Sequence, residues 1–203
     1  MPEKIYLPAL RAFMGDWTYY STIMKFRDIN ERIKYAEEIH ESKKLQDFIQ
    51  RELTPRGREI SDYLLTQSQR FFNSLIVGVY GGEPQWIELK IPKNDILPDF
   101  PLSQKGILGY LKLSGEETLF ALDGQHRVAG IKGALKELSP TSDLFDEEIS
   151  VIFIGHKNTQ EGKQRTRRLF TTLNRYAKPV KLSEIIAFVK KRYNDRLIFR
   201  GYQ

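Results

Sequence analysis

The residues best suited to chemistry form one short group, Asp-Gly-Gln-His-Arg, at positions 123–127. Strand-like residues (119–122) precede it, and small apolar residues that suit a helix follow it. A strand that feeds a helix through glycine leaves backbone N–H groups unpaired at the helix N-terminus, where the helix dipole also favours an anion. We therefore interpret this corner as a phosphate-binding site. The alternative is a capped helix with an ordinary salt bridge.

Each residue of the group has a role in such a site. Gly124 lets the backbone turn tightly and approach a ligand. Arg127 offers a planar fork that suits phosphate. His126 donates one hydrogen bond when neutral and two when charged, and Gln125 both donates and accepts. Asp123 can cap the helix or help to hold Mg²⁺ beside a phosphate.

Basic charge is concentrated toward the C-terminal end. Residues 157–200 contain 13 Lys/Arg and three Asp/Glu, a net charge of +10, whereas the whole chain carries +6. Such a segment is typical of a protein that binds a polyanion, although a solvated helical face explains the charge equally well. The predicted DNA-binding residues are Lys163, Arg165, Arg167, Arg168, Lys190, Lys191 and Arg192.

Several classes of site are excluded by composition. The chain has no cysteine, which excludes disulfides, a cysteine nucleophile and cysteine-ligated metals. Its three histidines do not share metal-ligand spacing, so we expect no metal site. There is no long apolar run and no signal-peptide pattern, so a soluble cytoplasmic protein without a membrane partner is expected.

The elements around the corner follow from periodicity. Expected helices cover 20–53, 58–69, 125–138, 162–174 and 183–193, with a break at 54–57. Expected strands cover 71–80 and 85–91, joined by a Gly81-Gly82 hairpin turn, then 107–113 and 118–122 as a second hairpin, and 148–156. This layout predicts a helical N-terminal arm (1–70), a mixed α/β core (71–156) and a basic helical segment (157–203) of a chain that can continue further.

Some further side chains have two interpretations. The aromatic side chains of Trp17, Tyr19 and Tyr20 can stack on bases, but core packing is the favoured interpretation. The carboxylates of Glu116 and Glu117 can act as acid or base, but they are also ordinary turn residues. Asn174 lies where it can end a helix in the left-handed conformation.

The Asp-Gly-Gln-His-Arg group resembles the name-giving motif of the DGQHR-domain family, which includes DndB-type DNA sulfur-modification proteins. Residues 10–26, 70–86 and 170–184 also resemble DndB-type segments in matching order. The resemblance implies an α+β fold with a ParB/sulfiredoxin-like mixed-sheet core. It also implies that the corner binds nucleotide phosphates, as ATP or CTP with Mg²⁺.

Relatives of this fold also inform the second segment. ParB proteins carry a second motif whose asparagine contacts the nucleotide, and Asn174 falls at the matching place. Leu173 replaces the acid of that motif, so ParB-type metal binding is in doubt, but phosphate contact by Arg175 and Lys178 is implied. Sulfiredoxins place a catalytic cysteine where this chain has Gln125, which excludes sulfinic-acid reduction.

The function that the resemblance implies is a DndB-like transcriptional repressor of a phosphorothioation-type modification system. Its partners would be double-stranded DNA, other DNA-modification proteins and, in a homo-oligomer, further copies of itself. The alternative is an ATP-hydrolysing, ParB-like enzyme of a DNA-modification or defence system, for which the sequence shows no convincing general base. A nuclease is disfavoured because clustered metal-binding carboxylates are missing.

Overall fold

The computed structural model describes residues 3–35, 43–90 and 106–155, together with 162, 164–166, 168, 169, 172 and 173. The chain divides into two compact units, residues 1–170 and 171–203. All but two of the described residues belong to the first unit, which contains every element named below.

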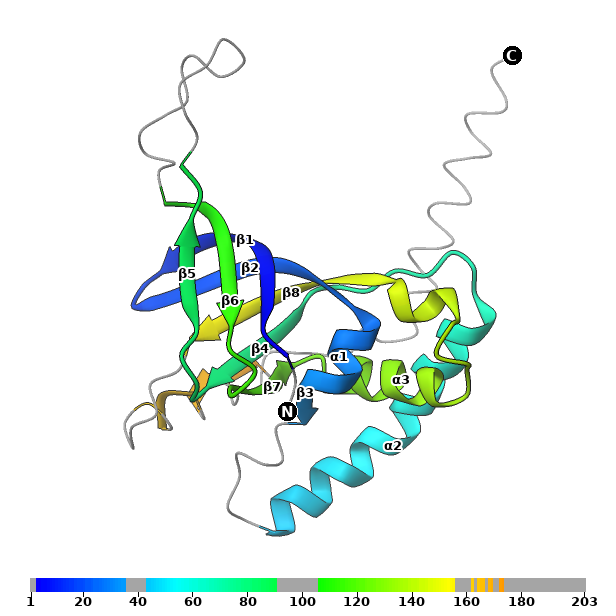
Figure 1. Cartoon of the computed structure of the whole chain (residues 1–203). Helices are drawn as coiled ribbons and strands as arrows, with labels where there is room; N and C mark the ends of the chain where they lie inside the picture. The colour runs from blue at the N-terminus through cyan, green and yellow to red at the C-terminus, as the bar shows by residue number, and fades with distance from the viewer. Residues whose placement is uncertain are drawn as a thin grey trace, which may run out of the picture. The chain divides into compact units, whose positions relative to one another are not determined.

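One mixed sheet forms the centre of the first unit (Figure 1). Its strands are β1 (Ile5–Met14), β2 (Trp17–Lys25), β3 (Ile33–Tyr35), β4 (Leu75–Tyr80), β5 (Gln85–Glu88), β6 (Leu108–Leu113), β7 (Thr118–Asp123) and β8 (Glu148–Gly155). They lie in the order β3-β7-β4-β8-β2-β1-β6-β5. The β3–β7 and β4–β8 pairs are parallel, and the other pairs are antiparallel.

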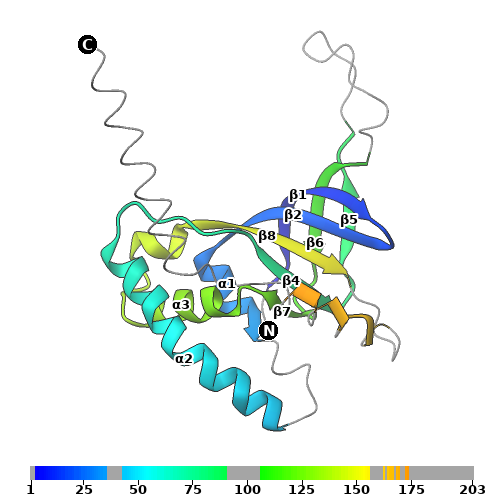
Figure 2. The ribbon, with the colours of Figure 1, turned by 180° about the vertical axis from the view of Figure 1, so that it is seen from behind.

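The described helices are α1 (Phe26–Arg32), α2 (Lys43–Thr66), α3 (Gln125–Lys136) and the short 3-10 helix η3 (Asp143–Asp146). Helices α2 and α3 run side by side in both views of the ribbon (Figures 1 and 2). Among the described residues no helix combines the length and the apolar character that crossing a membrane requires.

The core lies between one face of the sheet and the helices. Alternate residues of β8, Ile149, Val151 and Phe153, are buried, as the period of two in a strand requires. Val128 and Ile131 of α3, three residues apart and therefore on one helical face, are completely buried in the same cluster. The helix after the corner is thus anchored to the sheet by its own apolar face.

Glycine brings α2 and α3 together. A Cβ atom on Gly130 of α3 would lie 2.2 Å from Cγ2 of Ile60 in α2. A Cβ atom on Gly57 of α2 would lie 3.1 Å from Cβ of Ala129. The two helices can approach this closely only because these side chains are missing, and the contact fixes where the middle of α2 lies relative to the corner.

The prediction of a helical N-terminal arm was wrong for residues 5–25, which form β1 and β2. In β1 the exposed Tyr6 and Leu10 alternate with the buried Leu7 and Ala9, which is the period of a strand with one covered face. The expected helix break at 54–57 was also wrong. Helix α2 continues through Pro55 to Thr66, and its packing against α3 favours the helix over the local cost of proline.

Both predicted hairpins were wrong, although their strands form. Strand β4 pairs with β7 and β8, whereas β5 pairs with β6, and β6 and β7 are likewise not neighbours. Each turn therefore carries the chain from one part of the sheet to another. The two turns meet, because a Cβ atom on Gly82 would lie 2.6 Å from Cγ of Glu117.

Other expectations were confirmed. Helix α3 and strand β8 lie where periodicity placed them, and the fold combines a large mixed sheet with helices, as expected for the α+β class. Described residues within 162–174 are helical. The predicted helix at 183–193 lies outside the described residues, and the ParB/sulfiredoxin-like identity of the core stays a prediction.

Candidate functional site

Strand β7 ends at Asp123, and its pairing with β4 is irregular just before this residue. Ile76 of β4 pairs with Asp123, but the next residue, Val77, pairs with Ala121. Leu122 is therefore an extra residue in β7, and it is completely buried. Such bulges bend a strand and re-aim the side chains that follow.

Gly124 makes the turn from β7 into α3. Its φ of 87° lies in the left-handed region, which glycine adopts without the strain that a side chain would bring. Gly124 is also the N-cap of α3, and its carbonyl accepts a hydrogen bond from the N–H of Val128 at 3.0 Å. No described side chain caps this end, which leaves the first turn of α3 suited to an anion.

Arg127 holds the corner together. Its Nη1 donates to the carbonyl oxygens of Asn73 and Ser74, at 2.9 and 3.2 Å, in the segment that leads into β4. Its Nη2 donates to Oδ2 of Asp123 at 2.9 Å. The side chain of Arg127 is 16% exposed. Much of the planar fork predicted to bind phosphate is thus engaged within the protein, so Arg127 joins β4, β7 and α3.

Gln125 is the buried member of the group, at 8% exposure. Its side-chain carbonyl oxygen accepts no hydrogen bond within the described part of the chain. Unsatisfied acceptors of this kind are uncommon in folded proteins. Gln125 therefore faces the interior, and direct contact between its side chain and a ligand stays a prediction.

An open cleft of about 340 Å³ lies at the corner. Asp123, Gly124, His126 and Arg127 line one side, and α2 contributes Arg56, Glu59 and Ile60. Sequence reasoning missed these α2 residues because it placed Arg56 in a break between two helices, and the other two in a second helix (58–69) with no link to the corner. The charge pattern of α2 holds no signal for the cleft, since only the close packing of α2 on α3 brings Arg56 and Glu59 there.

Two predicted DNA-binding residues are among those described. The guanidinium of Arg165 lies over the indole of Trp17, 3.9 Å from the ring centroid, so this aromatic residue stacks on an arginine of the basic segment. Arg168 is exposed. The other predicted site residues lie outside the described residues: Lys163, Arg167, Asn174, Arg175, Lys178, Lys190, Lys191 and Arg192.

The other sequence candidates have structural roles. Tyr20 packs against Trp86 with ring centroids 5.2 Å apart. Glu117 accepts hydrogen bonds from the backbone N–H groups of Ser114 and Gly115 and from the Ser114 hydroxyl. Burial acts to raise the pKa of Glu117, but these hydrogen bonds outweigh it and lower the pKa. Among the described residues no three potential metal ligands cluster.

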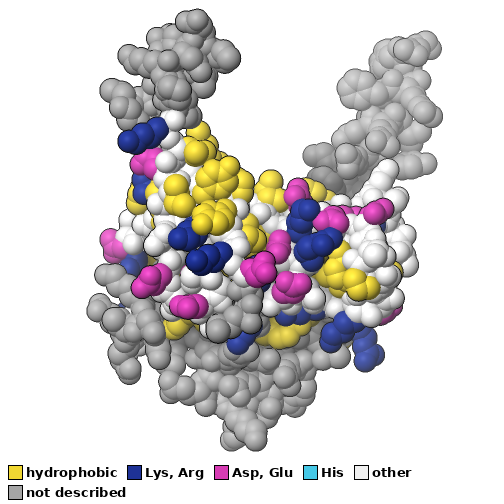
Figure 3. Space-filling model, in the orientation of Figure 1, with side chains coloured by type: hydrophobic (Ala, Val, Ile, Leu, Met, Phe, Trp, Pro, Cys, Tyr) yellow, Lys and Arg dark blue, Asp and Glu magenta, His cyan; other side chains and the backbone are white. Residues whose placement is uncertain are grey.

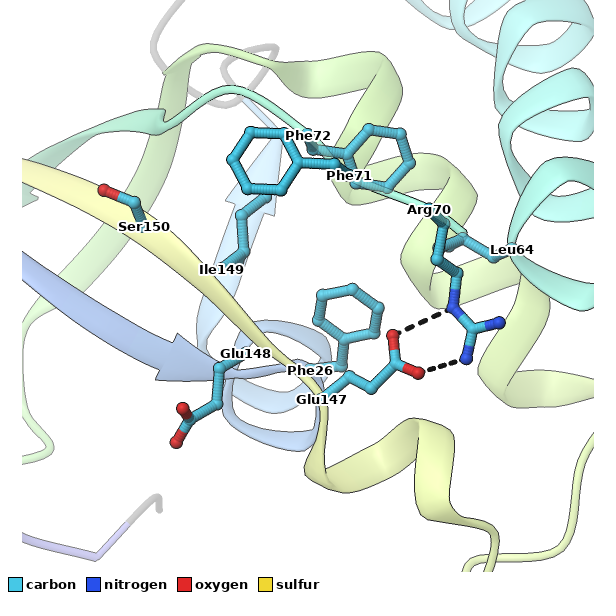
Figure 4. Close-up of a pocket in the computed structure, with 9 residues that line it drawn as sticks. All are labelled: Phe26, Leu64, Arg70, Phe71, Phe72, Glu147, Glu148, Ile149 and Ser150. Atoms are coloured by element: carbon cyan, nitrogen blue, oxygen red, sulfur yellow. Dashed lines mark hydrogen bonds and ion pairs between the residues drawn. The ribbon is translucent and has the colours of Figure 1, made fainter. Parts of the chain in front are cut away.

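A second, smaller pocket of about 110 Å³ lies between the end of α2 and the start of β8 (Figure 4). Arg70 forms two hydrogen bonds with the carboxylate of Glu147, which raise the pKa of Arg70. A third bond joins Nη1 of Arg70 to the carbonyl of Gln67 at 2.6 Å. This arginine therefore links the segment that follows α2 to the start of β8.

The model of the DndB family, described as DNA-sulfur modification-associated, matches residues 7–198. That range includes most of β1, the corner, α3, β8 and almost all of the basic segment. No curated protein and no solved structure matches the chain.

Proposed function

The chain belongs to the DndB family of DNA-sulfur modification-associated proteins, and from this we propose that it is a DNA-binding regulator of such a modification system. In this proposal the cleft at the start of α3 binds a phosphate group of a nucleotide or of DNA. The basic residues of 157–200 hold the duplex backbone. Repression of the modification genes is the regulatory role that fits a DNA-binding accessory protein best.

The proposal of a phosphate site rests mainly on the geometry at the start of α3. A helix N-terminus without a side-chain cap opens at a cleft that Arg56 and Arg127 both line. Backbone N–H groups, the helix dipole and arginine side chains are the usual components of a phosphate site. His126 lines the same cleft and adds a ring N–H donor.

The two arginines have different roles in this proposal. Arg127 already donates to Asp123 and to two backbone carbonyls, so it positions the glycine turn. Arg56 is exposed on α2 and is the side chain that supplies positive charge to the phosphate. The principal phosphate-binding side chain in this proposal therefore lies outside the Asp-Gly-Gln-His-Arg group.

The DNA-binding part of the proposal is supported by charge. A net charge of +10 between residues 157 and 200 is large for so short a segment. Binding through such residues releases counterions from DNA, so affinity should fall steeply as salt rises. Arg165, whose guanidinium lies over the Trp17 ring, places one of these cations at the end of the β1–β2 pair.

Matched arginine variants test the phosphate site. Arg58 is also exposed on α2, two residues from Arg56, but does not line the cleft. We expect Arg56→Ala to weaken calorimetric binding of ATP, CTP or inorganic phosphate by about tenfold or more, since a hydrogen bond to a charged group contributes roughly 1.5–3 kcal/mol. Arg58→Ala should leave it unchanged. Equal effects of the two variants would reject the cleft as the site.

A hydrolytic role is the second candidate, favoured by the carboxylates of Asp123 and Glu59 in the same cleft. Together they can hold Mg²⁺ beside a nucleotide. Phosphate release from ATP that requires Mg²⁺ and disappears in Glu59→Gln would support this role. Binding of duplex DNA without hydrolysis of ATP would reject the hydrolytic role and support the role as a regulator.

A further inference from the structure

An apolar surface lies on the face of the sheet opposite the core. Large hydrophobic side chains on β1, β2 and β5 are exposed there: Tyr6 at 52%, Leu10 at 49%, Met14 at 69%, Ile23 at 57% and Ile87 at 41%. We call these five residues the outer patch. In Figure 3, hydrophobic side chains gather over the part of the molecule that β1, β2, β5 and β6 occupy in Figure 1.

Strand register places the outer patch on one continuous surface. Ile87 pairs with Tyr110, and Tyr110 pairs with Pro8, so these three side chains form a row across β5, β6 and β1. Leu10 pairs with Leu108 in the next row on the same face. Paired residues point to the same side of a sheet, with strands about 4.8 Å apart.

The surface is large enough to be a protein interface. The five exposures together equal between two and three fully exposed side chains, which is on the order of 500 Å². The partly buried Leu108 and Tyr110 extend the surface. A stable dimer of standard size buries about 800 Å² on each partner, and patches near the upper end for monomers often mark an interaction site.

Charge indicates which kind of partner fits. Among the described residues, the charged side chains on this face lie at its margins, with Lys112 opposite Tyr6, Lys25 opposite Glu148, and Arg165 over Trp17, which pairs with Met14. Lys25 is itself paired with Asp146 at 2.9 Å. The described side chains in the middle of this face are apolar and offer DNA no cation. Two copies of the chain, each carrying +6 overall, would avoid bringing like charges together if they met through this face.

We propose that a second copy of this chain covers the outer patch, forming a two-fold symmetric dimer through the sheet faces. A two-fold interface uses the same surface on both partners, so an apolar face whose described charges lie at its margins meets its own kind. The inference stands independently of the proposed function. If both are correct, each dimer carries two basic segments, and the preferred DNA site has two-fold symmetry.

Mass in solution tests the dimer. Sedimentation equilibrium of the full chain across micromolar concentrations should give twice the 23.7 kDa of one chain. Leu10→Lys with Ile23→Lys should weaken dimerisation by roughly a hundredfold, since two charges would be buried unpaired. Phe71→Lys is the control, because Phe71 is 88% exposed and does not belong to the outer patch.

A cross-linking test does not require the protein to fold with the two lysine substitutions. The chain has no cysteine, so Leu10→Cys supplies a single thiol within the outer patch. A short bis-maleimide should cross-link this variant, but not Lys136→Cys at the end of α3. A monomer at all concentrations, or a dimer insensitive to the Leu10 and Ile23 variants, would overturn the proposal. Salt-sensitive DNA binding by such a monomer would leave the proposed function intact.

Discussion

Nη2 of Arg127 donates to Oδ2 of Asp123 across 2.9 Å, so the first and last residues of the Asp-Gly-Gln-His-Arg group are bound to each other. Between them, the left-handed Gly124 turns the chain. Because Arg127 also holds the carbonyls of Asn73 and Ser74, the group acts first as a structural joint. In the proposed function, phosphate binding at this corner requires that the joint be intact.

Arg127→Ala should destabilise the protein by about 2–3 kcal/mol, because three hydrogen bonds of a largely buried guanidinium are lost. Arg127→Lys should recover only part of this, since an ammonium group cannot reproduce the planar fork. Urea unfolding followed by circular dichroism measures both. Unchanged stability in Arg127→Ala would show that this arginine is mainly a ligand.

Gly124→Ala should cost more stability than Gly15→Ala, although both glycines have positive φ, at 87° and 56°. A Cβ atom on Gly124 would lie 2.5 Å from Cδ2 of Leu75 and 2.9 Å from Nε of Arg127, whereas nothing lies within 4 Å at Gly15. The Gly15 variant reports left-handed strain alone, roughly 1–2 kcal/mol. The difference between the unfolding midpoints of Gly124→Ala and Gly15→Ala then measures how much steric overlap at the corner destabilises the protein.

Gly130→Ala should separate α2 from α3. The added methyl would overlap the side chain of Ile60, and overpacking of this kind costs about 1–3 kcal/mol. Gly155→Ala at the end of β8 is the matched control, since open space surrounds its Cβ position. If the α2 position matters for the cleft, Gly130→Ala also weakens phosphate binding. Equal thermal stability of the two variants would contradict the packing described.

Glu117 should contribute stability that depends on pH. Its hydrogen bonds with Ser114 and Gly115 outweigh burial and hold its pKa below the ordinary value of 4.5. A lowered folded-state pKa means that the contribution is complete above pH 4.5 and disappears as pH falls through the folded-state value. Glu117→Gln should therefore cost about 1 kcal/mol at neutral pH and progressively less in acid.

The exposed neighbour Glu116 supplies the control for that measurement. Denaturant unfolding of Glu116→Gln should follow the wild type across the same pH range. A constant difference between Glu117→Gln and the wild type down to strongly acidic pH would show that ionisation of Glu117 has no part in stability.

The sequence pattern correctly predicted those helices and strands whose surroundings depend mainly on residues nearby in the sequence. Strand β8 alternates cleanly, and α3 follows a glycine corner, so both were correctly predicted. The turns at Gly81-Gly82 and Ser114-Gly115 were correct as turns and wrong as hairpins. Turn chemistry predicts a reversal of the chain, but strand pairing depends on which distant strands offer an edge.

The candidate site shows the same limit. The motif was evident from residue types, and its glycine conformation followed from them. The internal bonding of Arg127 and the arrival of Arg56 were not predictable, because the first depends on carbonyls of the β4 approach and the second on a contact between α2 and α3. Both arise from tertiary packing of segments far apart in sequence.

The position of β2 in the sheet has a consequence for synthesis of the chain. Strand β2 lies between β1 and β8, and Tyr20 pairs with Phe153. On the ribosome, one edge of β2 and one edge of β4 must wait until β8 has emerged before they are paired. Such non-local pairing slows folding and exposes aggregation-prone edges. Fragments that end before β8 are therefore expected to be insoluble, even though they contain the complete corner.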